Sequence, residues 1–388
     1  MKKHSYIGLD VHKESIAIAV AEGGRKGEVR EYGKVGGSLI ALERALRKVK
    51  KPGVELHCAY EAGPCGFVIY RRLKKLGIDC AVVAPSLIPR KAGERIKTNR
   101  RDAIKLARCH RAGELTVVYV PDARDEAIRD LCRARSDAVH DQRRSRQQLK
   151  ALLLRLGYHY TGKSSWNEAH LRYLRELEMT HPAQKVVLEE YLIAISQAGE
   201  RIGRLTNQIE GHVATWRMKP AVDALMAMRG IQLIAASVLL SELGDLSRFE
   251  HPRQLMGYLG LVSREESTGD SQRRGAITKC GNTHARWFLI ECAQHYALPP
   301  KVSKELSKRQ EHQPEPVKQL SWKAQTRLHR RFWGLMQRGL RRQKALVAVA
   351  RELSGFIWAL MRQVPLTSDP APFAQKAWGT TVPQNLSS

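Results

Sequence analysis

The hydrophobic pattern of this chain changes once, near residue 120, and this change constrains the fold more than any other feature. Before it, short apolar runs alternate with amphipathic stretches of helical spacing. After it, from about residue 125 to 216, apolar residues recur almost wholly at helical spacing. We therefore predict an α/β domain with a mixed sheet, followed by mainly helical units.

The first part contains five predicted strands and three predicted helices. The strands are Tyr6–Val11, Ser15–Ala21, Glu28–Val35, Val54–Tyr60 and Asp79–Ala84, and the helices are Ser38–Val49, Phe67–Leu76 and Asp102–Ala112. Gly77 follows the second helix, at the position where glycine commonly ends a helix. The order of these elements predicts a sheet whose first three strands form an antiparallel meander.

We predict five segments along the chain. They are an α/β domain over 1–120, a helical coiled-coil linker over 121–218, a C-terminal domain over 219–300, a basic helical extension over 301–364 and an irregular tail over 365–388. Within the linker, a seam from Leu188 to Ile209 repeats at alternating spacings of three and four, which is typical of a coiled coil. The sequence does not decide which helix pairs with this seam: the partner helix lies either in the same chain or in a second one.

Within 219–300, the stretch 225–243 is similar to a helix-hairpin-helix, whose turn offers backbone N–H groups to a phosphate. A loop rich in glycine and serine is expected over Ser263–Gly281. The seven cysteines are scattered and form no CxxC pair, so they indicate neither a disulfide framework nor a cysteine-based zinc site.

The charge balance points to a polyanion. Lys and Arg number 66 against 38 Asp and Glu, a formal net charge of +28, which is typical of nucleic-acid-binding proteins. The residues expected to contact nucleic acid outside the loop are Arg143, Arg144, Arg330, Arg331, Arg341 and Arg342. Trp322, Phe332 and Trp333 lie among them and either stack on unpaired bases or form the buried face of a basic helix.

No apolar stretch reaches the roughly 20 residues of a membrane-spanning helix, and the N-terminus lacks the apolar core of a signal peptide. We therefore expect a cytoplasmic protein without a membrane partner.

Three carboxylates stand where a metal site could form. Asp10 is at the end of the first strand and Glu61 follows the fourth, while Asp102 begins a helix with Asn99 three residues earlier. Acidic residues that converge at a sheet edge suit Mg²⁺, which supports phosphoryl transfer. The alternative for any one of them is a surface or helix-capping role.

Five motifs in this chain resemble those of the IS110/IS1111 transposases. YIGLDVHK at 6–13, YEAG at 60–63 and KTNRRDA at 97–103 resemble the acidic motifs of the family. Segments 248–261 and 267–282 resemble its C-terminal transposase domain, and the motifs occur in the family's order. The sequence of residues 108–121 is similar to that of the IS1111 branch of the family.

The resemblance implies a RuvC-like (RNase H-like) domain with four acids, a helical linker and a domain that carries a nucleophilic serine. It implies a DNA recombinase guided by a structured RNA that the element encodes. We expect the chain to form a homo-oligomer, a dimer or a tetramer. Carried over by position, the metal ligands are Asp10, Glu61 and Asp102. The third family position falls on Asn99, whose oxygen is a possible ligand but brings no charge, so Glu94 is an alternative.

The resemblance places the nucleophile directly before the loop glycine, where this chain has Thr268. We favour Ser267, one residue earlier, because its primary hydroxyl is less hindered, and keep Thr268 and Ser271 as alternatives. The structural alternative for each of these residues is that its hydroxyl only stabilises a turn. Basic residues expected to contact the scissile phosphate are Arg273, Arg274 and Lys279.

Two other function classes are consistent with these residues. One is a metal-only nuclease similar to a Holliday-junction resolvase, with water as the nucleophile. The other is a catalytically weakened nucleic-acid-binding scaffold, for which Asn99 is the motivating feature.

Overall fold

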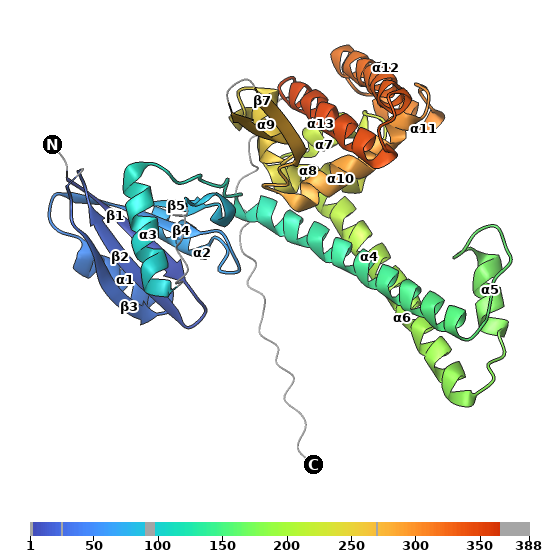
Figure 1. Ribbon diagram of the computed structural model, residues 1–388, viewed down its shortest axis with the longest axis horizontal. Coiled ribbons are helices and arrows are strands. Elements are labelled where there is room, and N and C mark those ends of the chain that lie inside the picture. Colours follow the sequence, from blue (N-terminus) through green and yellow to red (C-terminus); the bar gives the residue numbers. More distant parts are fainter. Residues whose placement is uncertain (1–2, 25, 90–97, 269–270, 365–388) are drawn as a thin grey trace. The chain divides into compact units, whose positions relative to one another are not determined.

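The protein is described by a computed structural model over residues 3–24, 26–89, 98–268 and 271–364, without the side chains of Ser267 and Gln272. The chain forms two compact units, Met1–Asp122 and Ala123–Ser388 (Figure 1). The predicted fold class is confirmed: an α/β unit with a mixed sheet precedes a mainly helical one. The finer boundaries at 218 and 300 remain predictions, and the 365–388 tail lies outside the described residues.

Unit 1 contains one five-stranded sheet in the order β3-β2-β1-β4-β5. Its elements are β1 (Lys3–Val11), β2 (Ser15–Glu22), β3 (Val29–Gly36), α1 (Leu39–Val49), β4 (Val54–Glu61), α2 (Val68–Lys75), β5 (Asp79–Val83), the 3₁₀ turn η1 (Pro85–Leu87) and α3 (Asn99–Ala112). The first three strands are antiparallel, and β4 and β5 run parallel to β1. The predicted meander and helix order are therefore correct.

The two faces of this sheet pack differently. On one face, large apolar side chains such as Ile7 and Leu9 pack against α1 and α2. On the other face, alanines of β2 meet Ala103 and Ala107 of α3. A Cβ on Gly8 would lie only 2.1 Å from the carbonyl oxygen of Ala103. Small residues therefore let α3 approach the backbone of β1 closely.

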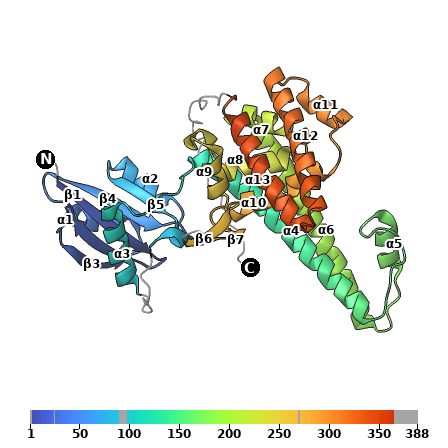
Figure 2. The same cartoon turned by 45° about the horizontal axis from the view of Figure 1, so that its top comes forward.

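Unit 2 begins with a long helical hairpin (Figure 2). Helix α4 (Ala123–Arg155) and helix α6 (Pro182–Ala214) lie side by side, with α5 (Glu168–Glu176) between them in sequence. Leu188 and Ile195 of the predicted seam are buried together with Leu149 and Leu152 of α4. The seam therefore pairs within the chain, which decides the alternative that the sequence left open.

The rest of unit 2 surrounds one large apolar core. It consists of α7 (Lys219–Met226), α8 (Leu233–Leu243), η2 (Leu246–Arg248), α9 (Pro252–Tyr258), β6 (Ser263–Thr268), β7 (Ser271–Ile277), α10 (Thr283–Ala293), η3 (Gln294–Ala297), α11 (Lys304–Gln310), α12 (Glu315–Gln337) and α13 (Arg342–Met361). The sequence predicts a turn between two helices here, and the structure has one between α7 and α8, in which Gly230 has φ +79°. Among the described residues, no helix is both long enough and apolar enough to cross a membrane.

The expectation of a loop over Ser263–Gly281 is wrong in part, because β6 and β7 form an antiparallel hairpin there. Its glycine, serine and charged residues carry little apolar alternation, so the strands are defined by their cross-strand pairing rather than by a buried face.

Candidate active site

Asp10 and Glu61 lie at the same end of two neighbouring parallel strands. Leu9 of β1 pairs with Tyr60 of β4 in register, and the two acids are the next residues along. Successive side chains of a strand point to opposite faces. Leu9 and Tyr60 are buried in the core with α1 and α2, so Asp10 and Glu61 are on the face that α3 covers.

Asp102 is on the first turn of α3, on this same face of the sheet. The Thr98 hydroxyl caps the helix by accepting a hydrogen bond from the Arg101 N–H at 3.3 Å. Ala103, the residue after Asp102, contacts Gly8, which is two positions before Asp10. The three predicted acids therefore belong to one face, although they come from separate segments.

Asn99 is the first residue of α3 and is exposed. Glu94, the alternative carboxylate, lies outside the described residues. The sequence reasoning missed His12, whose Nε2 is 3.2 Å from Asp10 Oδ2. The Asp-x-His spacing was the available signal.

Asp10, Glu61 and Asp102 present only oxygen atoms, which is the donor chemistry that Mg²⁺ prefers. The Asp10 side chain is 16% exposed, so it is sheltered but reachable. In the described part of the chain, the one group of three donors within 4.8 Å of one another is His4, Glu55 and His57, not these acids. The residues fit a hard cation by chemistry and by face, without forming a closed cage.

The second predicted set of residues is on the β6–β7 hairpin. In the register, Ser267 pairs with Gln272 and Thr268 with Ser271. Thr268 and Ser271 are exposed, so either hydroxyl is open to a ligand. Gly269 of the predicted motif lies outside the described residues.

Close backbone contacts hold the base of this hairpin. Arg286 is buried and donates hydrogen bonds to the carbonyl oxygens of Leu259 (2.8 Å) and Cys280 (2.9 Å), one on each side of the hairpin. Gly281 has φ +70°, and a Cβ there would lie 1.9 Å from the Tyr258 carbonyl oxygen. A side chain at this glycine would therefore separate the two segments.

Beneath the hairpin base lies a buried carboxylate that sequence reasoning missed. Glu242 of α8 has a side chain only 1% exposed and accepts two hydrogen bonds from Arg133 of α4, at 2.7 and 2.9 Å. It also accepts from Asn282 Nδ2 at 2.6 Å and from His284 Nδ1 at 3.0 Å. Asn282 in turn caps α10, so this carboxylate connects three helices.

Burial raises the pKa of Glu242, but the hydrogen bonds from His284, Arg133 and Asn282 together outweigh burial and lower that pKa to about 2. The carboxylate is therefore ionised at neutral pH. His284 Nε2 also lies 3.0 Å from Ser136 Oγ, so Ser136, His284 and Glu242 form a chain of side chains within hydrogen-bonding distance. Ser136 is buried and donates to the Cys132 carbonyl oxygen, so this chain braces the helices rather than offering a nucleophile.

The cations predicted beside the nucleophile are exposed on the hairpin and just after it. A groove of about 620 Å³ is lined by Arg264, Glu266, Arg273 and Arg274. Arg274 Nε lies 3.6 Å from Glu265, and Lys279 follows β7. This surface can accept a phosphate group.

The remaining predicted nucleic-acid contacts are also at the surface. They are Arg143 and Arg144 on α4, Arg330 and Arg331 on α12, and Arg341 and Arg342 at the start of α13. Phe332 is buried in the core, so it does not stack on a base. Trp322 and Trp333 are about half exposed.

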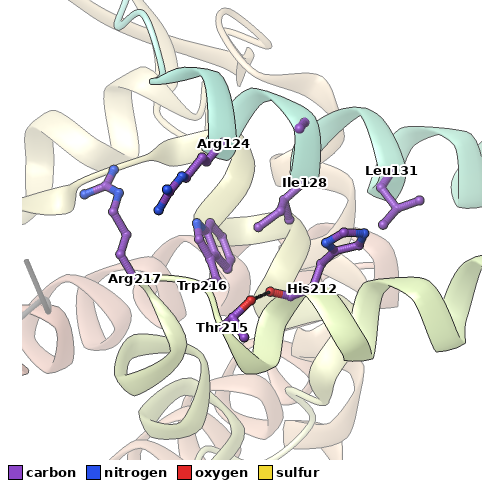
Figure 3. A pocket seen from close by; sticks show the side chains of 8 residues that line it. Arg124, Ile128, Leu131, His212, Thr215, Trp216 and Arg217 are labelled. Atoms are coloured by element: carbon purple, nitrogen blue, oxygen red, sulfur yellow. Dashed lines mark hydrogen bonds between the residues drawn. The ribbon is translucent and has the colours of Figure 1, made fainter. Parts of the chain in front are cut away.

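One further cavity, of about 460 Å³, lies between the start of α4 and the end of α6 (Figure 3). Its wall includes Ile128 and Trp216, and none of the predicted site residues lines it. Asp125 is fully buried and accepts hydrogen bonds from Trp216 Nε1, at 2.7 Å, and from Arg217. These bonds hold the two ends of the helical hairpin together.

An RNase H-like sheet with acids at one end, followed by a helical part with a basic hairpin, defines a class of DNA-processing enzyme. Comparison with known proteins identifies that class. A transposase profile of the IS110 DEDD type matches residues 7–157, and the profile described as "Transposase IS116/IS110/IS902 family" matches residues 222–306.

Individual relatives agree with these profiles. The transposase y4qE of Sinorhizobium fredii is 47% identical, over 94% of this chain and 90% of the relative. The transposase for insertion sequence element IS1533 of Leptospira borgpetersenii is 30% identical, over 86% of this chain and 97% of the relative. The transposase for IS1111A of Coxiella burnetii is 24% identical over 75% of this chain.

This chain therefore belongs to the IS116/IS110/IS902 family of transposases, enzymes that cleave and transfer DNA strands. Its DEDD-type domain implies a divalent metal ion, and a transposase binds the DNA of its element.

Proposed function

We propose that this transposase is an RNA-guided, serine-type recombinase with a Mg²⁺-binding acidic site. The observation that carries the proposal is the pairing of two chemically different sets of residues in one chain. In unit 1, carboxylate oxygens lie on one face of the sheet. In unit 2, hydroxyl groups and arginines lie on one hairpin, whose base is held by hydrogen bonds from Arg286. A metal-only nuclease, with water as the nucleophile, would need no reactive hydroxyl on this hairpin.

The proposed step is attack by the Ser267 hydroxyl on a DNA phosphorus atom. The hydroxyl loses its proton, a new P–O bond to serine forms, and one P–O bond of the DNA backbone breaks. The leaving DNA oxygen takes up a proton. The phosphoserine ester conserves the bond energy, so a DNA hydroxyl can later attack it and rejoin a strand without ATP. Arg273 and Arg274 neutralise charge on the phosphate oxygens.

Asp10, Glu61 and Asp102 would hold the divalent ion, which we propose is Mg²⁺, with the Asn99 oxygen as a neutral fourth donor. When bound, such an ion supplies charge neutralisation at the phosphate. The proposal requires that the acids and the hairpin act on the same phosphate, within one chain or between protomers of a dimer or tetramer.

We also propose that a structured RNA encoded by the element selects the DNA, in the bacterial cytoplasm where the DNA is. Its support is the family resemblance, together with the exposed arginines on α4, α12 and α13. Membership of the IS1111 branch remains a separate proposal, based on residues 108–121 alone.

The decisive experiment incubates the full chain, Mg²⁺ and labelled element-end DNA, with and without the cognate RNA. An RNA-dependent covalent protein–DNA adduct is expected. Ser267→Ala should abolish it, whereas Thr268→Ala should only slow its formation because Ser267 supplies the attacking oxygen. Peptide mapping of the adduct identifies the residue. Phosphate on Thr268 or Ser271 would reassign the nucleophile.

The two other function classes give different results in the same assay. A metal-only nuclease would cut the DNA without an adduct, and Ser267→Ala would leave the cutting intact. A scaffold would bind DNA and cut nothing, even after Asn99→Asp restores the family's acid.

A further inference from the structure

A second set of metal-ligating side chains lies at the other end of the strands that carry the acids. His4 comes from β1, and Glu55 and His57 come from the adjacent, parallel β4 (Figure 1). His4 Nδ1 is 3.0 Å from His57 Nε2 and 3.7 Å from Glu55 Oε2. One ligand atom of each residue lies within 4.8 Å of the others.

The distances match a tetrahedral ion. Two ligands at the usual Zn–N or Zn–O bond length of about 2.1 Å stand about 3.4 Å apart around a tetrahedral centre. The observed separations of 3.0 and 3.7 Å bracket that value. Glu55 is exposed, so rotation of its side chain can adjust the remaining separations while the strands keep their register.

His57 is oriented as a metal ligand by a third strand. Its Nδ1 lies 3.1 Å from Asp79 Oδ2 on β5, and Asp79 Oδ1 accepts a hydrogen bond from Lys74 at 2.6 Å. A carboxylate only accepts, so the proton of His57 is on Nδ1, and the lone pair of Nε2 faces His4 and Glu55. A carboxylate behind a ligating histidine is the arrangement that fixes the tautomer in zinc sites.

This cluster is separate from the acid set. His4 precedes Asp10 by six positions in β1, and Glu55 precedes Glu61 by six positions in β4. At about 3.3 Å per residue, the two ends are about 20 Å apart. The chemistry differs as well, because two imidazoles and one carboxylate suit Zn²⁺, whereas Mg²⁺ prefers oxygen ligands alone.

We propose that His4, Glu55 and His57 form a Zn²⁺ site with one open coordination position. The ion would join the beginnings of β1 and β4, the strands whose other ends carry Asp10 and Glu61. Its role is to fasten the first strand to the sheet. The His4 and Glu55 side chains are 42% and 46% exposed, so the ion reaches the site from solvent.

The test uses the full chain, stripped with a chelator and then titrated with Zn²⁺ against a chromophoric chelator, in excess Mg²⁺. One zinc ion per chain is expected. His4→Ala and His57→Ala should each abolish this binding, and Asp79→Asn should weaken it by about 10- to 100-fold through loss of the orienting carboxylate. His159→Ala, which removes an exposed histidine of unit 2, is the matched control and should bind as the wild type does.

A second measurement needs no variant. Hydrogen exchange with and without Zn²⁺ should show slower exchange in β1 and β4 and little change in unit 2. Zinc binding that survives both histidine substitutions, or protection that is confined to unit 2, would overturn the proposal.

Discussion

Replacing the buried carboxylate Glu242 by glutamine should destabilise unit 2 strongly. Glutamine keeps the volume of the side chain but removes the charge that pairs with Arg133 and accepts from Asn282 and His284. The pKa of Glu242 is lowered from 4.5 to about 2, and a shift of this size corresponds to about 3 kcal/mol of stability at neutral pH. Breaking a fully buried ion pair typically costs about 3–5 kcal/mol; because the Arg133 side chain is 49% exposed, we expect a loss near the lower end of this range.

The dependence on pH gives the sharper test. The native pKa is lower than the unfolded one, so the stabilisation is complete above pH 4.5 and is lost as pH falls toward 2. By pH 3, about 2 kcal/mol of it should be gone. The stability difference between the wild type and Glu242→Gln should therefore shrink by this amount between pH 7 and pH 3.

Urea unfolding followed by tryptophan fluorescence measures this difference, because all seven tryptophans are in unit 2. Glu352→Gln is the control. Glu352 pairs with Arg327 and Arg331 nearer the surface, with a side chain 23% exposed, and its loss should cost no more than about 1 kcal/mol. A Glu242→Gln effect that stays the same from pH 7 to pH 3 would refute the reasoning.

Three further predictions concern the acids, the charge and the packing of α3. Asp10→Ala or Glu61→Ala should abolish strand cleavage in a gel assay and leave DNA binding nearly unchanged, since binding depends on the basic surface; unimpaired recombination would remove the metal-site assignment. Filter binding should show affinity for DNA falling by about 10³–10⁵ between 50 and 200 mM salt, if about 6–10 phosphates are neutralised; a flat response would mean that the +28 charge serves another purpose. Gly8→Ala should destabilise unit 1 by about 1–3 kcal/mol, because its Cβ would meet the Ala103 carbonyl oxygen. Hydrogen exchange in β1 and α3 measures this loss, and Gly63→Ala, where a Cβ meets nothing within 4 Å, should have little effect.

The placement of Asp10 and Glu61 at the ends of two neighbouring strands was largely predictable because it follows from local patterns. Apolar runs located β1 and β4, and parallel neighbours necessarily end at the same edge, so Asp10 and Glu61 were expected together. The family motif added Asp102. His12 was missed, although its Asp-x-His spacing was visible in the sequence.

The sequence by itself determined the order of strands and helices in unit 1, the helical character of unit 2 and the family, because periodicity and motifs depend on residues close together in the chain. Tertiary structure alone decided three other features. The coiled-coil seam pairs with α4 of the same chain, and residues 263–277 form a hairpin through cross-strand bonds. Glu242 meets Arg133 across a sequence separation of 109 residues. Such contacts depend on how whole helices and strands pack, and a local pattern carries no record of which distant residue a side chain will reach.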